Sequence, residues 1–306
     1  MLKKMPTFSA KHENHEIKVY STRSSKPVVT QHIRPDHRPF LHPIYPPDGV
    51  GELTEYSPGH HPHQTGLYWG FTRINGSEID NKIVDEWFYR SDKPVDIKDQ
   101  IGRDFFHNPG GDYWRLNEAN ILVSSGDVVR WQSTYDLLGN SEETILSETQ
   151  DWSIRESAAA FILDLEWQGL ARKHTTIGAF SYGGLFLRMP YREERGGTAL
   201  NSSGQYGAEA EGRPARWVGV EMPITGREDM ESSTCSLIIM DHPTNPIYPT
   251  PWRVDGQLGI GPCRAIRGSW EIKENNTESF RHRLMIVSGE LDPTEIEKSW
   301  DDFAIT

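Results

Sequence analysis

Two segments decide the fold class of this sequence: Val128-Val-Arg-Trp-Gln-Ser-Thr-Tyr135 and Glu142-Glu-Thr-Ile-Leu-Ser-Glu-Thr149. Each mixes polar residues with β-branched or aromatic ones, which is typical of a strand with one buried face. The connection between them, residues 136–141, contains Leu-Gly-Asn, a combination that suits a turn. The two segments are therefore predicted to form a β-hairpin.

Short segments of the same kind recur along the chain, bounded by Gly, Pro, Asn and Asp, whereas helical periodicity is scarce. The other expected strands are 16–20, 27–32, 66–74, 120–124, 161–166, 236–240 and 281–287. We therefore predict an all-β protein, a large two-sheet antiparallel β-sandwich formed by a single domain, residues 1–306. The polar stretches 192–214 and 223–231 are expected to be long loops.

One short helix is expected at the carboxy-terminal end, over residues 293–303. Asp292 is a suitable N-cap, Pro293 suits the first helical position, and acidic residues follow in the first turn. We expect this helix to pack on the sandwich without a chemical role.

The charge balance limits the classes of partner. The formal net charge is -12, which disfavours nucleic acid and anionic membrane surfaces. No apolar segment approaches the length of a membrane span, and the first residues lack the apolar stretch of a signal peptide, so a cytoplasmic protein is expected. Cys235 and Cys263 are too few for a disulfide framework, although a single bridge between them stays open. The oligomeric state also stays open.

The densest group of candidate functional residues is Ser57-Pro-Gly-His-His-Pro-His-Gln-Thr-Gly66, which holds three of the twelve histidines. Histidine is the side chain most ready to move protons or bind metal near neutral pH. Pro62 favours an extended backbone at His61, and residues i and i+2 of an extended chain share a face. His61 and His63 are therefore predicted to point to one place. The structural alternative is a set of loop histidines at a strand end.

A second group lies in residues 240–253, where four prolines stiffen a polar loop. Asp241 and His242 again combine a carboxylate with an imidazole, and we expect His242 to share a pocket with His61 and His63. The alternative is a structural corner in which Asp241 caps a turn.

The remaining candidates are less specific. Residues 38–49 carry His42 and Tyr45, and the paired glycines in 181–188 indicate a bulge. Residues 85–87 and 105–112 add carboxylates and His107, each unspecific by itself. The sequence contains no Walker loop, dinucleotide glycine fingerprint, Gly-x-Ser-x-Gly elbow or His-Glu-x-x-His motif.

Several of these segments occur in the order seen in a bacterial family called PmoA-like: Arg38-Pro-Phe-Leu-His-Pro-Ile44, His61-Pro-His-Gln-Thr-Gly-Leu-Tyr-Trp-Gly70, Tyr182-Gly-Gly-Leu-Phe-Leu-Arg188 and Asp241-His-Pro-Thr-Asn-Pro246. The chain resembles this family over about residues 30–300. The resemblance implies a soluble β-sandwich similar to the large sandwiches of sugar mutarotases. Gln64 and Thr65 depart from the family pattern, in which a second His and an Arg are common at these positions.

We therefore expect an enzyme that acts on a sugar, glycoside or oxidised sugar derivative by histidine-mediated acid–base chemistry, of hydrolase or lyase type. The expected catalytic residues are His61, His63, His242 and Asp241. The expected substrate-binding residues are Arg38, His42, Gln64, Trp69, Asn245 and Trp252. The partner would be a small carbohydrate.

Two alternatives remain. The first is a metal-dependent oxygenase with His61, His63 and a carboxylate as ligands. A divalent metal in any of these schemes would bind His61, His63 and His242, with Asp241 or Glu86 as oxygen ligands. The second alternative is a sugar-binding sandwich without catalysis.

Overall fold

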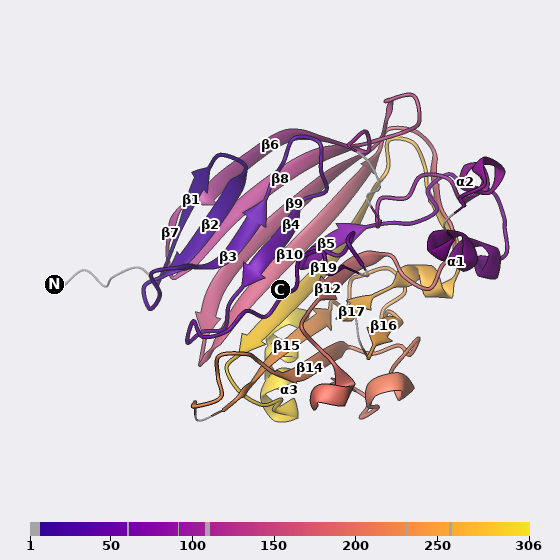
Figure 1. Ribbon diagram of the computed structural model, residues 1–306. Coiled ribbons are helices and arrows are strands. Elements are labelled where there is room, and N and C mark those ends of the chain that lie inside the picture. The colour runs from indigo at the N-terminus through magenta and orange to yellow at the C-terminus, as the bar shows by residue number, and fades with distance from the viewer. Residues whose placement is uncertain (1–6, 60, 91, 108–110, 231, 257–258) are drawn as a thin grey trace.

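The structure is a computed structural model of the 306-residue chain, and it describes residues 7–59, 61–90, 92–107, 111–230, 232–256 and 259–306. Two large antiparallel sheets pack face to face, and Figure 1 shows them as stacked layers. The nine-stranded sheet has the order β16 (Trp252–Asp255), β17 (Gly259–Pro262), β12 (Gly184–Arg188), β5 (Leu67–Gly70), β4 (Phe40–Ile44), β3 (Pro27–His32), β2 (Glu16–Ser21), β1 (Phe8–Glu13) and β7 (Ser125–Gly126). The eight-stranded sheet has the order β13 (Thr198–Asn201), β14 (Trp217–Pro223), β15 (Thr234–Asp241), β19 (Thr277–Val287), β10 (Ala160–Ala171), β9 (Thr144–Ser157), β8 (Val128–Leu138) and β6 (Trp114–Val123). The predicted two-sheet antiparallel sandwich is thus confirmed.

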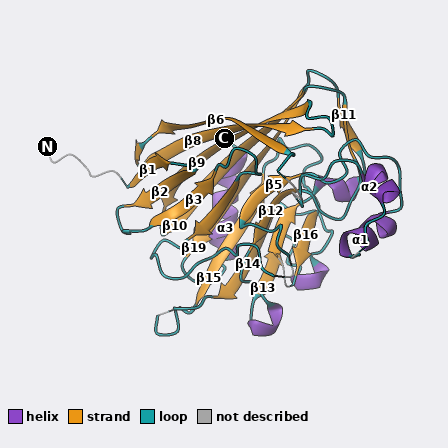
Figure 2. Ribbon diagram, turned by 45° about the horizontal axis from the view of Figure 1, so that its top comes forward, coloured by secondary structure: helices purple, strands orange, loops and turns teal. Residues whose placement is uncertain are grey.

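A small third sheet pairs β11 (Thr175–Ile177) with β18 (Trp270–Ile272). The α-helices are α1 (Asn81–Tyr89), α2 (Val95–Ile101) and α3 (Pro293–Ala304), and the 3-10 helices are η1 (Glu193–Arg195), η2 (Gly207–Glu209) and η3 (Arg264–Arg267). Figure 2 shows α1 and α2 together at one end of the sandwich. Among the described residues, no helix has the length and apolar character needed to cross a membrane.

The predicted hairpin is formed by β8 and β9, with Trp131 opposite Trp152 and Tyr135 opposite Glu148. Every second residue of β8 from Val129 onward is buried, as the alternating sequence predicts for a strand with one face on the core. The pairing continues to the turn at residues 139–143, so both strands are longer than the segments expected from the sequence. The hairpin supplies part of the inner face of the eight-stranded sheet.

The C-terminal helix is also confirmed. In α3, the Asp292 side chain accepts hydrogen bonds from the backbone N–H groups of Thr294 and Glu295. The helix buries Ile296 and Phe303 against the outer face of the eight-stranded sheet, in a cluster with residues such as Met240 and Trp217. Its amphipathic pattern therefore has a direct packing partner.

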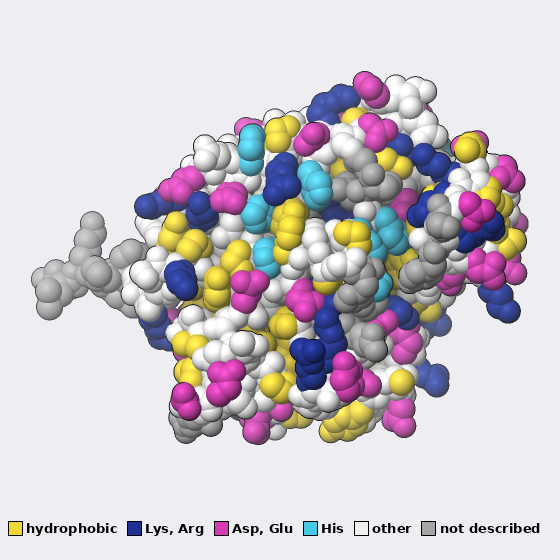
Figure 3. Space-filling view, viewed as in Figure 1, with side chains coloured by type: hydrophobic (Ala, Val, Ile, Leu, Met, Phe, Trp, Pro, Cys, Tyr) yellow, Lys and Arg dark blue, Asp and Glu magenta, His cyan; other side chains and the backbone are white. Residues whose placement is uncertain are grey.

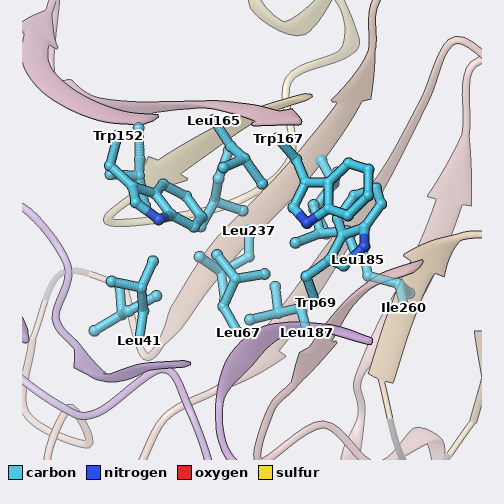
Figure 4. Close-up of a cluster of buried hydrophobic side chains, with 14 of the residues drawn as sticks. Leu41, Leu67, Trp69, Trp152, Leu165, Trp167, Leu185, Leu187, Leu237 and Ile260 are labelled. Atoms are coloured by element: carbon cyan, nitrogen blue, oxygen red, sulfur yellow. The ribbon is translucent and has the colours of Figure 1, made fainter. Parts of the chain in front are cut away.

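The main core lies between the two sheets and is rich in tryptophan and leucine, as Figure 4 shows. Trp69 of β5 stacks on Trp167 of β10 with a ring-centroid distance of 4.6 Å and an interplanar angle of 16°. Because the two rings come from different sheets, their contact joins the layers. Burial of such large apolar surfaces is the main stabilising contribution in a sandwich.

A polar network is buried within this apolar core. Gln31 of β3 accepts a hydrogen bond from Trp131 Nε1 at 2.9 Å and donates to Ser133 Oγ at 3.2 Å, so it links the two sheets. Buried polar groups are tolerated when they are hydrogen-bonded. The network therefore constrains how the sheets pack, since a shift of one sheet would break these hydrogen bonds.

The same network ends at a buried carboxylate, Glu148 of β9. Its two oxygens accept hydrogen bonds from Gln150 Nε2 at 2.7 Å and from Trp167 Nε1 at 2.8 Å. Only 1% of Glu148 is exposed, and burial raises its pKa from the ordinary 4.5 to about 7.

Several local expectations differ from the structure. Helices α1 and α2 were not predicted, and β5 covers only part of the expected strand 66–74. The expected loop 192–214 contains the short strand β13 and two 3-10 helices. Cys235 and Cys263 are both free and buried, so the bridge that the sequence left open is not formed.

Replacement of Glu148 by Gln is expected to reduce the pH dependence of folding stability. The pKa of Glu148 is higher in the folded than in the unfolded chain, so between pH values of about 4.5 and 7 the folded state keeps a proton that the unfolded state loses. The stabilisation is complete below the unfolded pKa and is lost as the pH rises through the folded pKa. In the wild type, the free energy of unfolding should fall by on the order of 3 kcal/mol over this pH range.

Urea unfolding followed by tryptophan fluorescence at pH 5 and pH 8 measures this difference. The exposed Glu118 on β6 provides the control, Glu118→Gln, which should keep the wild-type pH dependence. Equal pH dependence in wild type and Glu148→Gln would show that Glu148 does not titrate in this range.

Candidate active site

A cavity of about 780 Å³ lies at the end of the sandwich that carries α1 and α2. Its aromatic lining consists of Trp87, Phe88, Phe106, Tyr113, Tyr182 and Phe186. Its polar lining includes His61, His63, Gln64, Asp104, His107 and Arg253. The cavity thus combines aromatic walls with a few convergent polar groups, as small-molecule sites commonly do.

His61 and His63 both line this cavity, as the sequence predicts, but the backbone between them is a turn and not extended. The N–H of Gln64 donates to the carbonyl of His61 at 3.0 Å, with Pro62 as the first inner residue of the turn. The two imidazole rings have centroids 5.6 Å apart and planes at 66°. The neighbouring His60 lies outside the described residues.

The most closely coupled polar pair in the cavity is Asp104 with His107. Asp104 Oδ2 is 2.6 Å from His107 Nδ1, and Asp104 Oδ1 accepts from the backbone N–H groups of Phe106 and His107, both at 3.1 Å. A carboxylate in this position accepts the Nδ1 proton, which leaves the Nε2 lone pair directed away from Asp104. The Tyr182 hydroxyl is 3.3 Å from Nε2.

Packing holds the His107 ring in place. Its ring stacks on Phe88 of α1 at a centroid distance of 4.0 Å and contacts the His63 ring at 4.4 Å. Burial, together with the charges on His107 and Arg38, lowers the pKa of His63 to about 2. His63 is therefore neutral near pH 7 and can accept or donate a hydrogen bond without a net charge.

Arg38 lies beneath the loops that carry these histidines. Its guanidinium donates to the carbonyl of Phe106, to the carbonyl of His63 at 2.6 Å and to Thr65 Oγ1 at 3.2 Å. It also lies 3.6 Å from the centroid of the Tyr68 ring. Arg38 was expected to bind the substrate, but only 1% of it is exposed and it does not line the cavity. Its contacts instead position the loops of the site.

Gln64 is the only expected substrate-binding residue that lines the cavity among the described residues. Its side-chain oxygen accepts from Arg188 Nη1 at 3.2 Å, and Arg188 Nε donates to Glu55 at 2.7 Å. This contact orients the Gln64 amide. Its substrate-binding role stays a prediction.

The Asp241–His242 group does not join the cavity. His242 packs against Phe303 of α3 with a centroid distance of 4.8 Å, and its Nδ1 lies 2.7 Å from Thr244 Oγ1. The expected convergence of His242 with His61 and His63 is therefore wrong. The reason is that the loop after β15 lies over the outer face of the eight-stranded sheet, next to the C-terminal helix.

Asp241 and Asn245 fix the corner of that loop. Asp241 accepts from Asn245 Nδ2 at 2.7 Å and from the N–H of Thr250 at 2.8 Å, and burial raises its pKa to about 6. Asn245 is also bonded to the backbone of Arg281 on β19. These contacts match the structural alternative for this loop, and neither residue lines the cavity.

Three further residues that were expected to bind the substrate, Trp69, Trp252 and His42, do not line the cavity. Trp69 faces the core, and Trp252 is fully buried and donates to the carbonyl of Ala215 at 2.9 Å. Neither tryptophan therefore offers a ring face to the cavity. His42 lies on the outer face of the nine-stranded sheet, where its Nδ1 is 2.9 Å from Thr54 Oγ1, and it does not line the cavity either.

The expected metal ligands are not assembled. His242 is remote from His61 and His63 in its contacts, and Glu86 of α1 does not line the cavity. Within the described part of the chain, no group of three or more His, Cys, Asp or Glu side chains is arranged to hold a metal ion.

The sequence did not single out Asp104 or Tyr182, and it indicated His107 only as an unspecific candidate. The signal for Asp104 and His107 was the spacing Asp104-Phe-Phe-His107, which allows a local carboxylate–imidazole contact. It gave no sign that α1 and α2 would cover this turn and form a cavity around it.

Residues 9–301 match the model of a protein family described as a family of unknown function, DUF6807. No curated protein matches the sequence. The PmoA-like resemblance is not tested by the family match and stays a prediction.

Solved structures that resemble the chain include an α-galactosidase from Lactobacillus brevis, with 8% identity and a TM-score of 0.47. They also include a galactose mutarotase-like protein from Lactobacillus casei, with 7% identity and a TM-score of 0.41, and a galactose mutarotase related enzyme from Lactobacillus acidophilus, with 7% and 0.40. The matches cover 94%, 91% and 92% of this chain. They cover 40% of the α-galactosidase, 99% of the L. casei protein and 97% of the L. acidophilus protein.

Replacement of Arg38 by Met is expected to destabilise the fold. The apolar side chain would leave the buried carbonyls of His63 and Phe106 without their donor, at a cost of about 1–3 kcal/mol for each group. The exposed Arg34 provides the control, Arg34→Met. Urea unfolding should therefore give a clearly lower free energy of unfolding for Arg38→Met only. Equal stability of the two variants would contradict the positioning role.

Proposed function

We propose that this chain, which belongs to the DUF6807 family of unknown function, is an enzyme that acts on a sugar, glycoside or oxidised sugar derivative by histidine-mediated acid–base chemistry. The reaction would be of hydrolase or lyase type. The observation that carries the proposal is the line Asp104–His107–Tyr182 inside an aromatic-walled cavity.

The proposed proton-transfer group is Nε2 of His107. When Nε2 takes a proton from the substrate, the ring becomes an imidazolium, and the Asp104 carboxylate at 2.6 Å stabilises that charge. In the reverse direction the imidazolium returns the proton to a leaving oxygen or carbon. The contact with Asp104 also fixes the tautomer, since it keeps the hydrogen on Nδ1.

Tyr182 and the other cavity histidines support this assignment. The Tyr182 hydroxyl, 3.3 Å from Nε2, is within reach of a substrate atom that contacts His107. His61 and His63 line the same cavity, and neutral His63 offers a hydrogen bond without a competing charge. His61 and His63 therefore keep their expected catalytic roles as part of the proposal, whereas His242 and Asp241 have no contact with this site that would support one.

A carbohydrate suits the shape and lining of the cavity. Sugar rings have apolar C–H faces that pack on aromatic rings and hydroxyl groups that need hydrogen-bond partners. The rings of Trp87, Phe106 and Tyr182 and the amide of Gln64 supply both kinds of contact. The cavity volume of about 780 Å³ is within the range of small-molecule sites, roughly 300–1,000 Å³.

Loss of the proposed proton-transfer group should abolish turnover with little effect on folding. In His107→Asn the amide still donates to Asp104, but no atom replaces Nε2, so turnover should fall at least about 100-fold. The assay is a panel of free sugars, uronates, aryl glycosides and keto-glycosides, with thermal melting as the measure of folding. His174→Asn, at an exposed histidine, is the control and should match the wild type.

The same panel tests the alternatives. His61→Ala should also lose activity while it melts near the wild-type temperature. A loss of folding in that variant would favour a structural role for His61. Binding of a sugar without turnover of any substrate would favour the non-catalytic alternative. Equal turnover by His107→Asn and wild type would overturn the proposed role of His107.

A further inference from the structure

The charge of the cavity lining is opposite in sign to the charge of the whole chain. The chain has a formal net charge of -12, yet its cavity is lined by Lys93, Lys98 and Arg253 and, among the described residues, by one carboxylate, Asp104. Figure 3 shows histidine side chains across the middle of this face, and both basic and acidic side chains on the lobe formed by α1 and α2. A site of local positive charge in an acidic protein favours an anionic ligand.

Asp104 is outnumbered by the three cationic side chains of the lining, and its oxygens already have hydrogen-bond partners. Both of its oxygens are already used, by His107 Nδ1 and by the backbone N–H groups of Phe106 and His107. Its oxygens therefore have partners within the protein and do not need one from the ligand.

Arg253 is not the cation available to a ligand. Its guanidinium donates to Glu211 Oε1 at 2.6 Å and to Asp255 Oδ2 at 2.7 Å, so its charge is balanced by two carboxylates. Burial raises the pKa of Asp85, and the nearby Arg253 opposes that shift, so a further carboxyl group lies near Arg253.

Lys93 and Lys98 are different, because neither forms an ion pair with a described residue. Lys93 Nζ lies 4.5 Å from the centroid of the Trp87 ring and donates to the Phe88 carbonyl at 3.3 Å, which holds the ammonium at the cavity. These contacts leave two of its three N–H donors unused. Lys98 is exposed and lines the cavity from α2.

The acidic residues of the same helices do not neutralise this pair at the cavity. Glu86, Asp96 and Asp99 are exposed and do not line it. Asp92 forms its ion pair with Arg90. The two lysines are therefore the cations that a bound ligand would meet.

We propose that the cavity binds a sugar that carries a carboxylate, such as a hexuronic acid. Lys93 and Lys98 contact the carboxylate, the ring packs on the aromatic walls, and the other end of the ring faces His107. This inference rests on the proposed function, because it names the substrate class of the same cavity. Two ammonium groups match a monoanionic carboxylate, whereas sites for a phosphate dianion usually add arginine forks or backbone N–H groups.

Isothermal titration calorimetry of the full chain tests the proposal with D-glucuronate and D-galacturonate, D-glucose and D-galactose, and glucose 6-phosphate as probes. The wild type should bind a uronate roughly tenfold more tightly than the matching neutral hexose, since two partly exposed ion pairs contribute modestly. The variant Lys93→Gln/Lys98→Gln should bind both sugars equally. The control Lys82→Gln/Lys273→Gln removes two exposed lysines that do not line the cavity and should keep the preference.

Three outcomes would overturn the proposal: equal or absent binding of uronate relative to the neutral hexose, a uronate preference that survives in Lys93→Gln/Lys98→Gln, or much tighter binding of glucose 6-phosphate than of either uronate. The readout is binding, so it is separate from the turnover test of His107. A neutral sugar turned over in a His107-dependent reaction would contradict the substrate class alone. Uronate binding with His107-independent turnover would contradict the catalytic assignment alone.

Discussion

The alternation of side chains along β5 and β12 is the constraint on which both the core and the cavity depend. Trp69 and Leu185 point into the sandwich, where they join the main core, while Tyr68 and Phe186 point to the opposite face and form a separate cluster with Phe106. A shift of one residue in either strand would exchange the two sets. The stacking of Trp69 on the other sheet therefore also fixes which aromatic rings lie beneath the site.

Arg38 transmits this arrangement to the reacting groups. A buried guanidinium is costly unless it is hydrogen-bonded, and here both terminal nitrogens donate, to loop carbonyls and to a threonine hydroxyl, whereas Nε has no partner among the described residues. Burial lowers the pKa of Arg38 only to about 10, so it remains charged near pH 7 and contributes to the low pKa of His63. One side chain thus holds the loops of the site in place and adds to the effect of burial on His63.

Features that depend on local sequence could be predicted, whereas those that depend on the face of a sheet could not. The hairpin of β8 and β9 and the capped helix α3 are encoded by neighbouring residues. His61 and His63 share a cavity as predicted, although a turn joins them and not the expected extended backbone. The positions of Trp69 and His242 could not be predicted without the strand register and the sheet order. A tryptophan suits a core as well as a ligand-binding surface, and a stiff loop suits a structural corner as well as a site.

Helix α1 was not predicted, although its sequence carries helical signals. Asp80 caps it by accepting from the N–H of Lys82, and Val84, Trp87 and Phe88 follow at spacings typical of one helical face. The pattern was readable, but the helix is short and lies in a chain dominated by strand signals. Because α1 was not predicted, the sequence did not indicate that the contact between Asp104 and His107 lies inside a cavity.

The connection from β5 to β6, residues 71–113, carries α1, α2 and most of the cavity lining, including Asp104 and His107. It begins after β5 of the nine-stranded sheet and ends at β6, an edge strand of the eight-stranded sheet. The sandwich therefore holds both of its ends, whereas α1 and α2 belong to neither sheet. Substitutions within such a segment have little effect on sheet pairing. In evolutionary terms, a single contiguous stretch could diverge to new substrates while most of the strands stay under selection for folding.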